Sequence, residues 1–209
     1  STYSICAGNS INLFASATSN SSTAVTLLTE NFNGATNNWT KLNNSTGGVP
    51  ADAAWTLRPN NYNYGGNSYR SNDNTQFYFS NSDDQGTGGI TSTILQSPSF
   101  STVGLTSASL TFYHYFNSND PLTDFARVEV STDGSNWTNL NTYTTDQGGR
   151  TSFSLVTLSL NGYLDEATLF IRYKYDAPFG WYWAIDNVSV SGVAAVPPAP
   201  TYAWTSSPA

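Results

Sequence analysis

Turn-forming dipeptides recur along the whole chain and divide it into short segments. They include Asn33-Gly34, Gly65-Gly66, Gly88-Gly89, Asp133-Gly134 and Asn161-Gly162. The segments between them are rich in Val, Ile, Thr and aromatic residues, a composition typical of antiparallel strands. No segment repeats its apolar residues with a helical period. The chain is therefore expected to be all-β, and 209 residues suffice for one large β-sandwich or for two half-size domains.

Alternation of apolar and polar residues places the strands. The clearest ones are predicted at 107–117, 125–132, 136–141, 151–160, 167–175 and 181–191, with weaker ones near 24–32, 53–57, 67–71, 75–80 and 90–100. Within 167–175 one face carries Leu169, Ile171, Tyr173 and Tyr175, and the other carries Phe170, Arg172 and Lys174. Because successive strand residues point to opposite faces, the first set is predicted to face the core.

Charge limits the partners that this chain can bind. Charged residues make up only 10% of it, and the net charge is −7. This acidity disfavours nucleic acid, whose phosphates require clustered Lys and Arg. No apolar run approaches the roughly 20 residues that a membrane-spanning helix needs. The Asn, Ser and Thr content, scarce Lys, absent Met and single Cys6 favour an exported, cell-surface or extracellular protein.

The two ends of the chain differ from its middle. Residues 1–17 resemble two short strands around a Gly turn, and 201–205 begins a further strand. Residues 18–23 and 192–200 have the composition of linkers. We therefore divide the chain into residues 1–23, a central domain at 24–192, and residues 193–209.

Catalysis finds little support in the residue inventory. His114 is the only histidine and Cys6 the only cysteine, so any triad or thiol nucleophile must use them. His114 is in phase with Leu110, Phe112 and Phe116, which predicts a structural, core-facing imidazole. The 14 acidic residues leave room for a pair of catalytic carboxylates, although nothing in their spacing favours one. The chain is expected not to be an enzyme.

Two acidic residues stand out as candidate calcium ligands, because calcium prefers carboxylate, amide and backbone oxygens. Glu30 ends the first strand of the central domain, and Asp186 interrupts the last one. The apolar phase of that last strand slips after Ile185, which predicts a β-bulge at Asp186-Asn187 that aims a carboxylate out of the ladder. The alternative is that both acids merely end strands. For Asp73, Asp83, Asp84, Asp120 and Asp124, solvated turns are the favoured interpretation.

Aromatic residues before the last strand could stack on sugar rings. Alternation puts Trp181 and Trp183 on one face, for which core packing is expected, and Tyr182 on the other. Phe179 and Tyr182 are therefore the candidate ligand-binding residues.

Six motifs occur in the same order as in a known family. They are Glu30-Asn-Phe-Asn-Gly34 with Trp39, Gly65-Gly-Asn-Ser-Tyr69, Leu95-Gln-Ser-Pro-Ser-Phe100, Leu110-Thr-Phe112, Val128-Glu-Val-Ser-Thr-Asp-Gly-Ser-Asn-Trp137 and Trp183-Ala-Ile-Asp-Asn-Val188. Over about residues 24–192 this order resembles the cleaved-adhesin and MAM-like jelly rolls of Bacteroidetes surface proteins. The resemblance implies a two-sheet jelly-roll β-sandwich with structural calcium where the first and last strands approach, on Glu30 and Asp186. Asn33 and Asn187 stand where relatives often carry an acid, and the backbone near Phe32 is a further candidate ligand.

The ends carry a resemblance of their own. Ile5-Cys-Ala-Gly-Asn-Ser-Ile-Asn-Leu13 and Thr201-Tyr-Ala-Trp-Thr-Ser-Ser-Pro208 resemble successive early strands of the Ig-like repeats in giant flavobacterial adhesins. This implies a jelly roll inserted into an Ig-like domain, with neighbouring Ig-like repeats as partners and a Cys6 partner outside this chain. The combination is similar to gliding-motility adhesins exported by the type IX system, which implies surface attachment and an extracellular ligand such as surface polysaccharide. The alternative is a carbohydrate-binding accessory domain of a secreted hydrolase or peptidase.

Overall fold

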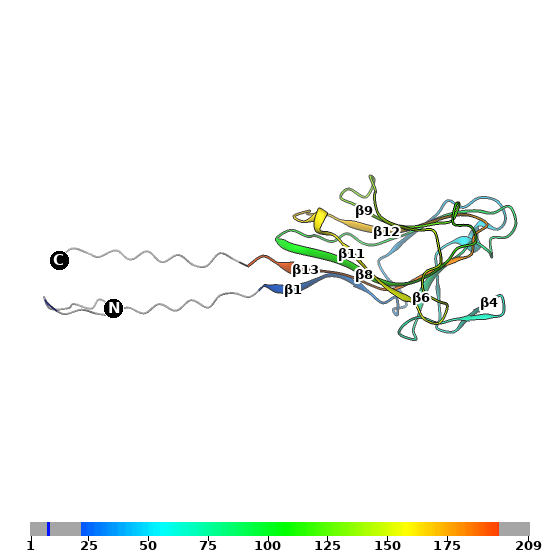
Figure 1. Cartoon of the computed structure of the whole chain (residues 1–209), viewed down its shortest axis with the longest axis horizontal. Coiled ribbons are helices and arrows are strands. Elements are labelled where there is room, and N and C mark those ends of the chain that lie inside the picture. Colours follow the sequence, from blue (N-terminus) through cyan, green and yellow to red (C-terminus); the bar gives the residue numbers. More distant parts are fainter. Residues whose placement is uncertain (1–7, 9–21, 197–209) are drawn as a thin grey trace.

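The chain folds into a sandwich of two antiparallel sheets in the computed structural model, which describes residue 8 and residues 22–196 (Figure 1). The six-stranded sheet contains β1 (Thr23–Glu30), β3 (Thr56–Arg58), β6 (Phe77–Asn81), β8 (Leu105–Asn117), β11 (Ser154–Ser159) and β13 (Tyr182–Ala194). The five-stranded sheet contains β2 (Thr40–Asn43), β7 (Ile90–Gln96), β9 (Phe125–Ser131), β10 (Thr138–Tyr143) and β12 (Phe170–Pro178). The all-β sandwich predicted from the alternation is confirmed.

Four smaller elements complete the described part of the chain. A hairpin of β4 (Tyr62–Tyr64) and β5 (Asn67–Tyr69) forms a separate two-stranded ladder. Two single 3₁₀ turns, η1 (Pro50–Ala53) and η2 (Asn161–Tyr163), connect strands. Within the described residues no helix is long and apolar enough to cross a bilayer.

The main core lies between the two sheets. Leu169, Ile171, Tyr173 and Tyr175 are fully buried, as their alternation predicts, and so are Ala126 and Val128 of β9. They pack against residues of the opposite sheet that include Phe112, Phe116 and Trp183. Each such large apolar side chain stabilises the fold by about 1.5–3 kcal/mol through burial.

A second aromatic cluster covers the outer face of the six-stranded sheet. It contains Tyr69, Phe77, Phe79, Phe153, Tyr182 and Ala184. Phe77 and Phe79 flank Tyr78, which points into the main core, so β6 buries side chains on both faces. The outer face of this sheet is thus covered around β6 and the start of β13, while alternate residues of β1 and β11 remain exposed.

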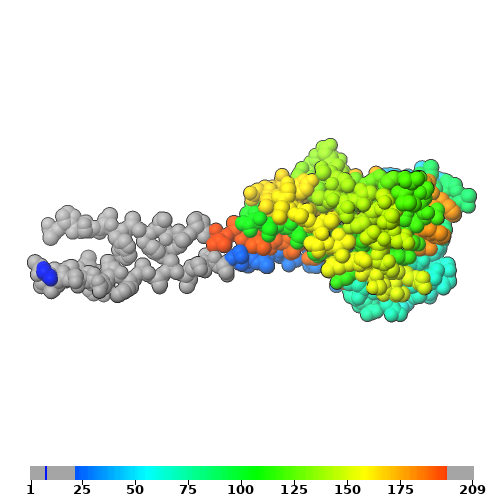
Figure 2. Space-filling model, viewed as in Figure 1, coloured from blue at the N-terminus to red at the C-terminus, as the bar shows by residue number. Residues whose placement is uncertain are grey.

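Strand β13 changes its neighbour along one edge. Its first residues pair with β6, where Ile185 lies opposite Tyr78, and its later residues pair with β1, where Val188 lies opposite Glu30. The other edge of β13 pairs with β8 over nearly the whole strand. Thr23 of β1 lies opposite Ala194 of β13, so the first and last strands run side by side at the narrow end of the molecule (Figure 2).

Most predicted strands are present with shifted ends. β2 and β4 were not predicted, because strands of four and three residues are too short for alternation to stand out. β12 begins at Phe170 rather than at 167, since Leu169 forms an isolated bridge with Phe100. β1 begins at Thr23 and β13 ends at Ala194, close to the expected limits 24 and 192. Cys6, the Ig-like strands expected at 1–17 and 201–205, and linker residues 18–21 and 197–200 lie outside the described residues.

Candidate functional site

The bulge predicted in the last strand is present. Asp186 lies opposite Tyr113 of β8, whereas Ser189 lies opposite Thr111, so β13 contains one extra residue here. Asn187 supplies the irregularity with a left-handed backbone (φ 46°). The bulge lies where β13 changes its partner from β6 to β1. At this point one edge of the strand is released from the ladder and side chains from other loops can approach.

Asp186 is a fully buried carboxyl group, and no cationic side chain of the described residues pairs with it. Its exposed fraction is 0%, and Oδ2 has no hydrogen-bond partner among the described residues. Oδ1 accepts from the Asn187 backbone N–H at 2.8 Å. Burial, with the nearby charge of Asp73, raises the pKa of Asp186 to about 8. A carboxyl in this environment gains strongly from a bound cation.

Asp73 brings a second carboxylate to the same place. Its Oδ2 accepts from Asn187 Nδ2 at 3.1 Å, and its Oδ1 accepts from the Ser71 hydroxyl at 3.0 Å and from the Thr75 backbone N–H and hydroxyl. Burial opposes ionisation of Asp73, but these hydrogen bonds together lower its pKa. The expectation of a merely solvated turn at Asp73 is therefore wrong. The signal missed was the dense run of Ser, Asn and Asp that wraps the carboxylate.

Glu30 closes the turn that follows β1. Its Oε1 accepts from the Phe32 backbone N–H at 2.7 Å, and Phe32 itself is buried with a left-handed backbone (φ 56°). Gln76 then joins this turn to the Asp73 loop. Its backbone N–H donates to Asn33 Oδ1 at 3.1 Å, and its Nε2 donates to the Phe32 carbonyl at 3.1 Å.

We call the place where β13 changes its partner from β6 to β1 the joint. Its residues supply some of the oxygen ligands that a hard cation needs. Asp186 Oδ2 and Asn187 Oδ1 are both buried and unpartnered, and Asp73 adds a carboxylate beside them. Carboxylate and amide oxygens are calcium ligands. No three His, Cys, Asp or Glu side chains gather for a metal within the described part of the chain, so Glu30 does not form one cluster with both aspartates. Asn33 lies with Glu30 on the turn side of the joint.

The aromatic candidates divide between surface and interior. Phe179 is 39% exposed and has a left-handed backbone (φ 59°). Tyr182 is only 8% exposed, because it packs in the outer aromatic cluster, stacked on Phe79. Trp183 lies in the main core as expected, but Trp181 packs against the outer cluster instead of sharing its face. Trp181 precedes β13, so strand alternation does not extend to it.

His114 is buried among aromatic rings. Its exposed fraction is 0%, and Nδ1 accepts from Trp183 Nε1 at 3.3 Å. Desolvation lowers its pKa to about 4, so the imidazole is neutral at physiological pH. This agrees with a structural role. Asp124 is also buried and accepts from the backbone of Asn119 and Asp120, which corrects the expectation of a solvated turn there.

Comparison with known proteins finds similarity in structure alone. No family model and no curated protein matches the sequence. The K3 cleaved adhesin domain of Lys-gingipain from Porphyromonas gingivalis superposes with a TM-score of 0.52 at 17% identity, covering 81% of this chain and 99% of that domain. The K1 domain of the same protein gives 0.53 at 15% identity, covering 80% and 97%.

A carbohydrate-binding module of family 61, in complex with β-1,4-galactotriose, is also similar, with a TM-score of 0.47 at 11% identity over 73% of this chain and 87% of that chain. At such identities the likeness to the adhesin domains concerns the fold. The cleaved-adhesin-like sandwich expected from the order of motifs is confirmed at that level.

Proposed function

We propose that this chain is a non-catalytic binding module of a large extracellular adhesin. The observation that supports this most directly is the pairing of β1 with β13, in which Thr23 lies opposite Ala194. A module attached through this end presents the loops at the opposite end and the outer face of its five-stranded sheet to the surroundings. The Ig-like resemblance of the terminal segments supports a place within a giant surface protein, including one used in gliding.

Attachment by the isolated chain tests this function. Beads coated with the full chain should adhere under flow to surfaces coated with extracellular matrix, protein as well as polysaccharide, and beads coated with heat-denatured chain should not. Equal attachment of both bead types would show that the fold has no part in adhesion. Release of sugar or peptide fragments from the surface would contradict a non-catalytic role.

We further propose that a structural calcium ion binds at the joint of β1, β6 and β13. Asp186, Asp73 and Asn187 are the residues that would hold it, and Glu30 and Asn33 hold the adjoining turn. The buried, unpartnered Oδ2 of Asp186 carries this proposal. Calcium would neutralise two neighbouring carboxylates and connect the last strand to the Asp73 loop.

Thermal unfolding with calcium and with chelator tests this site. At a calcium concentration well above its dissociation constant, the melting temperature should rise by about 5–10 °C. Asp186→Asn should abolish that rise, yet in chelator at pH 8 it should be at least as stable as the wild type, because the variant buries no charge. Glu30→Gln should lower stability in both conditions, and Asp83→Asn, in a loop at the far end of β6, should leave the calcium effect unchanged. An equal melting temperature with and without calcium, with no bound metal, would refute the proposal.

A further inference from the structure

A groove of about 380 Å³ crosses the outer face of the five-stranded sheet. Strand β2 supplies Lys41 and Leu42 to its lining, β7 supplies Gln96, β12 supplies Arg172, and the turn after β9 supplies Trp137. In the order of this sheet, β9, β12, β7 and β2 are successive neighbours. The groove therefore spans three strands, β12, β7 and β2, or about 10 Å at the usual strand spacing, and the turn after β9 closes one side of it.

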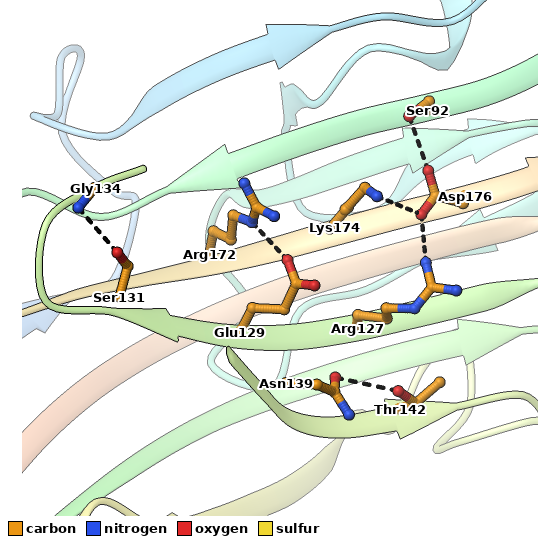
Figure 3. A network of polar contacts seen from close by, with 10 residues as sticks. All are labelled: Ser92, Arg127, Glu129, Ser131, Gly134, Asn139, Thr142, Arg172, Lys174 and Asp176. Carbon is orange, nitrogen blue, oxygen red and sulfur yellow. Dashed lines mark hydrogen bonds and ion pairs between the residues drawn. The ribbon is translucent and has the colours of Figure 1, made fainter. Parts of the chain in front are cut away.

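Trp137 and Arg172 form one wall of the groove as a fixed unit. The Arg172 guanidinium lies 4.1 Å from the centre of the Trp137 ring, within the range of a cation–π contact. Its Nε also donates to Glu129 Oε2 at 2.5 Å across the β9–β12 pair (Figure 3). Trp137 remains partly exposed. A large aromatic ring held in place beside a groove is prepared for stacking, because little side-chain entropy is lost on binding.

The opposite side of the groove is also apolar. Leu42, on the edge strand β2, is 53% exposed, and it lies opposite the buried Ile94 of β7. Gln96 adds a hydrogen-bonding side chain to the lining, whereas the Lys41 side chain lies on the other face of β2, over the ring of Tyr78. Arg172 donates to Glu129 through Nε alone, so the N–H groups of its two terminal nitrogens are available to a ligand. Alternating apolar surface and donors match a ligand that combines apolar ring faces with hydroxyl groups.

Charges around the groove balance one another. Arg172 is paired with Glu129, and Asp133 lies in the adjoining turn. Farther along the sheet, Asp176 binds both Arg127 and Lys174, so these cations are also compensated (Figure 3). The chain as a whole carries a net charge of −7. A polyanion would be repelled by the molecule without gaining a free basic patch.

We propose that this groove binds a neutral polysaccharide, with a sugar ring against Trp137 and hydroxyl groups hydrogen-bonded to Gln96 and Arg172. The inference rests on the proposed binding function and gives it a site and a ligand class. The length of the groove favours a chain of sugars over a single ring. The site differs from the one expected at Phe179 and Tyr182, since Tyr182 is buried.

Affinity electrophoresis of the full chain in gels containing xylan, β-1,4-galactan, mixed-linkage glucan or polygalacturonate tests the proposal. At least one neutral polysaccharide should retard the wild type, and polygalacturonate should not. Trp137→Ala should weaken retardation about tenfold or more, and Trp137→Phe less. Gln96→Ala should also weaken it, and because it removes no aromatic packing it controls for misfolding of the tryptophan variant. Phe179→Ala is the matched control at the far end of the sandwich and should bind as the wild type.

Retardation by polygalacturonate alone would overturn the neutral ligand class. Binding that survives Trp137→Ala but is lost in Phe179→Ala would overturn the site. If no polysaccharide retards the wild type while coated beads still adhere, the groove inference fails and the adhesive function stands. If the beads also fail to adhere, both fail.

Discussion

At the scale of single residues, His114 makes stability depend on pH. The unfolded chain takes up a proton on this imidazole as pH falls below 6.5, whereas the folded chain, with a pKa of about 4, does not. The contribution of neutral His114 to the free energy of unfolding is therefore fully present above pH 6.5, and it is lost as pH falls toward 4. Between pH 7 and pH 4.5 the loss due to His114 should be about 2 kcal/mol.

His114→Asn isolates this contribution, because an amide oxygen can still accept from Trp183 Nε1 but does not titrate in this range. Urea unfolding in chelator at the two pH values should show a smaller pH effect in the variant by that amount. An identical pH dependence in both proteins would mean that the imidazole is already charged, or solvated, in the folded state.

At the scale of elements, the extra residue in β13 keeps Val188 and Val190 in the core. Both are buried, and they continue the core face on the opposite parity from Trp183 and Ile185. Deleting Asn187 would restore a regular ladder and turn the following side chains to the other face. We expect the deletion variant to lose cooperative urea unfolding.

The matched control is Asn187→Gly, which keeps the residue count and tolerates the left-handed backbone. It should remain folded and lose about 1 kcal/mol, since only the hydrogen bond to Asp73 is removed. A cooperative, equally stable deletion variant would show that the second half of β13 can re-register without loss.

At the scale of the whole molecule, the positions of β1 and β13 set its response to force. The two strands are antiparallel, and Thr23 lies opposite Ala194, so tension between the chain ends opens their hydrogen bonds one after another. Tension between the amino end and Leu122, in the loop between β8 and β9, instead pulls β1 along its length and loads those bonds together.

Single-molecule stretching should therefore give a lower unfolding force through the chain ends than through the amino end and residue 122. Calcium should raise the force for complete unfolding in both geometries, since its site lies beyond the last β1–β13 pair, Glu30–Val188. Equal forces in the two geometries without calcium would contradict opening that begins at β1.

Much of the fold was predictable because burial in a sheet has a period of two residues. Alternation identified the core faces of β9 and β12, and the phase slip after Ile185 located the bulge at Asp186-Asn187. Alternation did not predict the burial of Tyr182, because it separates the two faces of a strand but does not tell which face is solvated. Here the outer aromatic cluster buries the second face as well.

The sequence by itself determined the all-β class, the two core faces and the irregular position of Asp186, since each depends on local periodicity. Only the tertiary structure decided which residues meet. Asp73 contacts Asn187, 114 positions later in the sequence. The contact forms where the pairing of β13 with β6 ends, at Ile185, and its pairing with β1 begins, at Val188. The same holds for the groove beside Trp137, which three strands and a turn build together. Such juxtapositions depend on strand order, and no local pattern of residues encodes it.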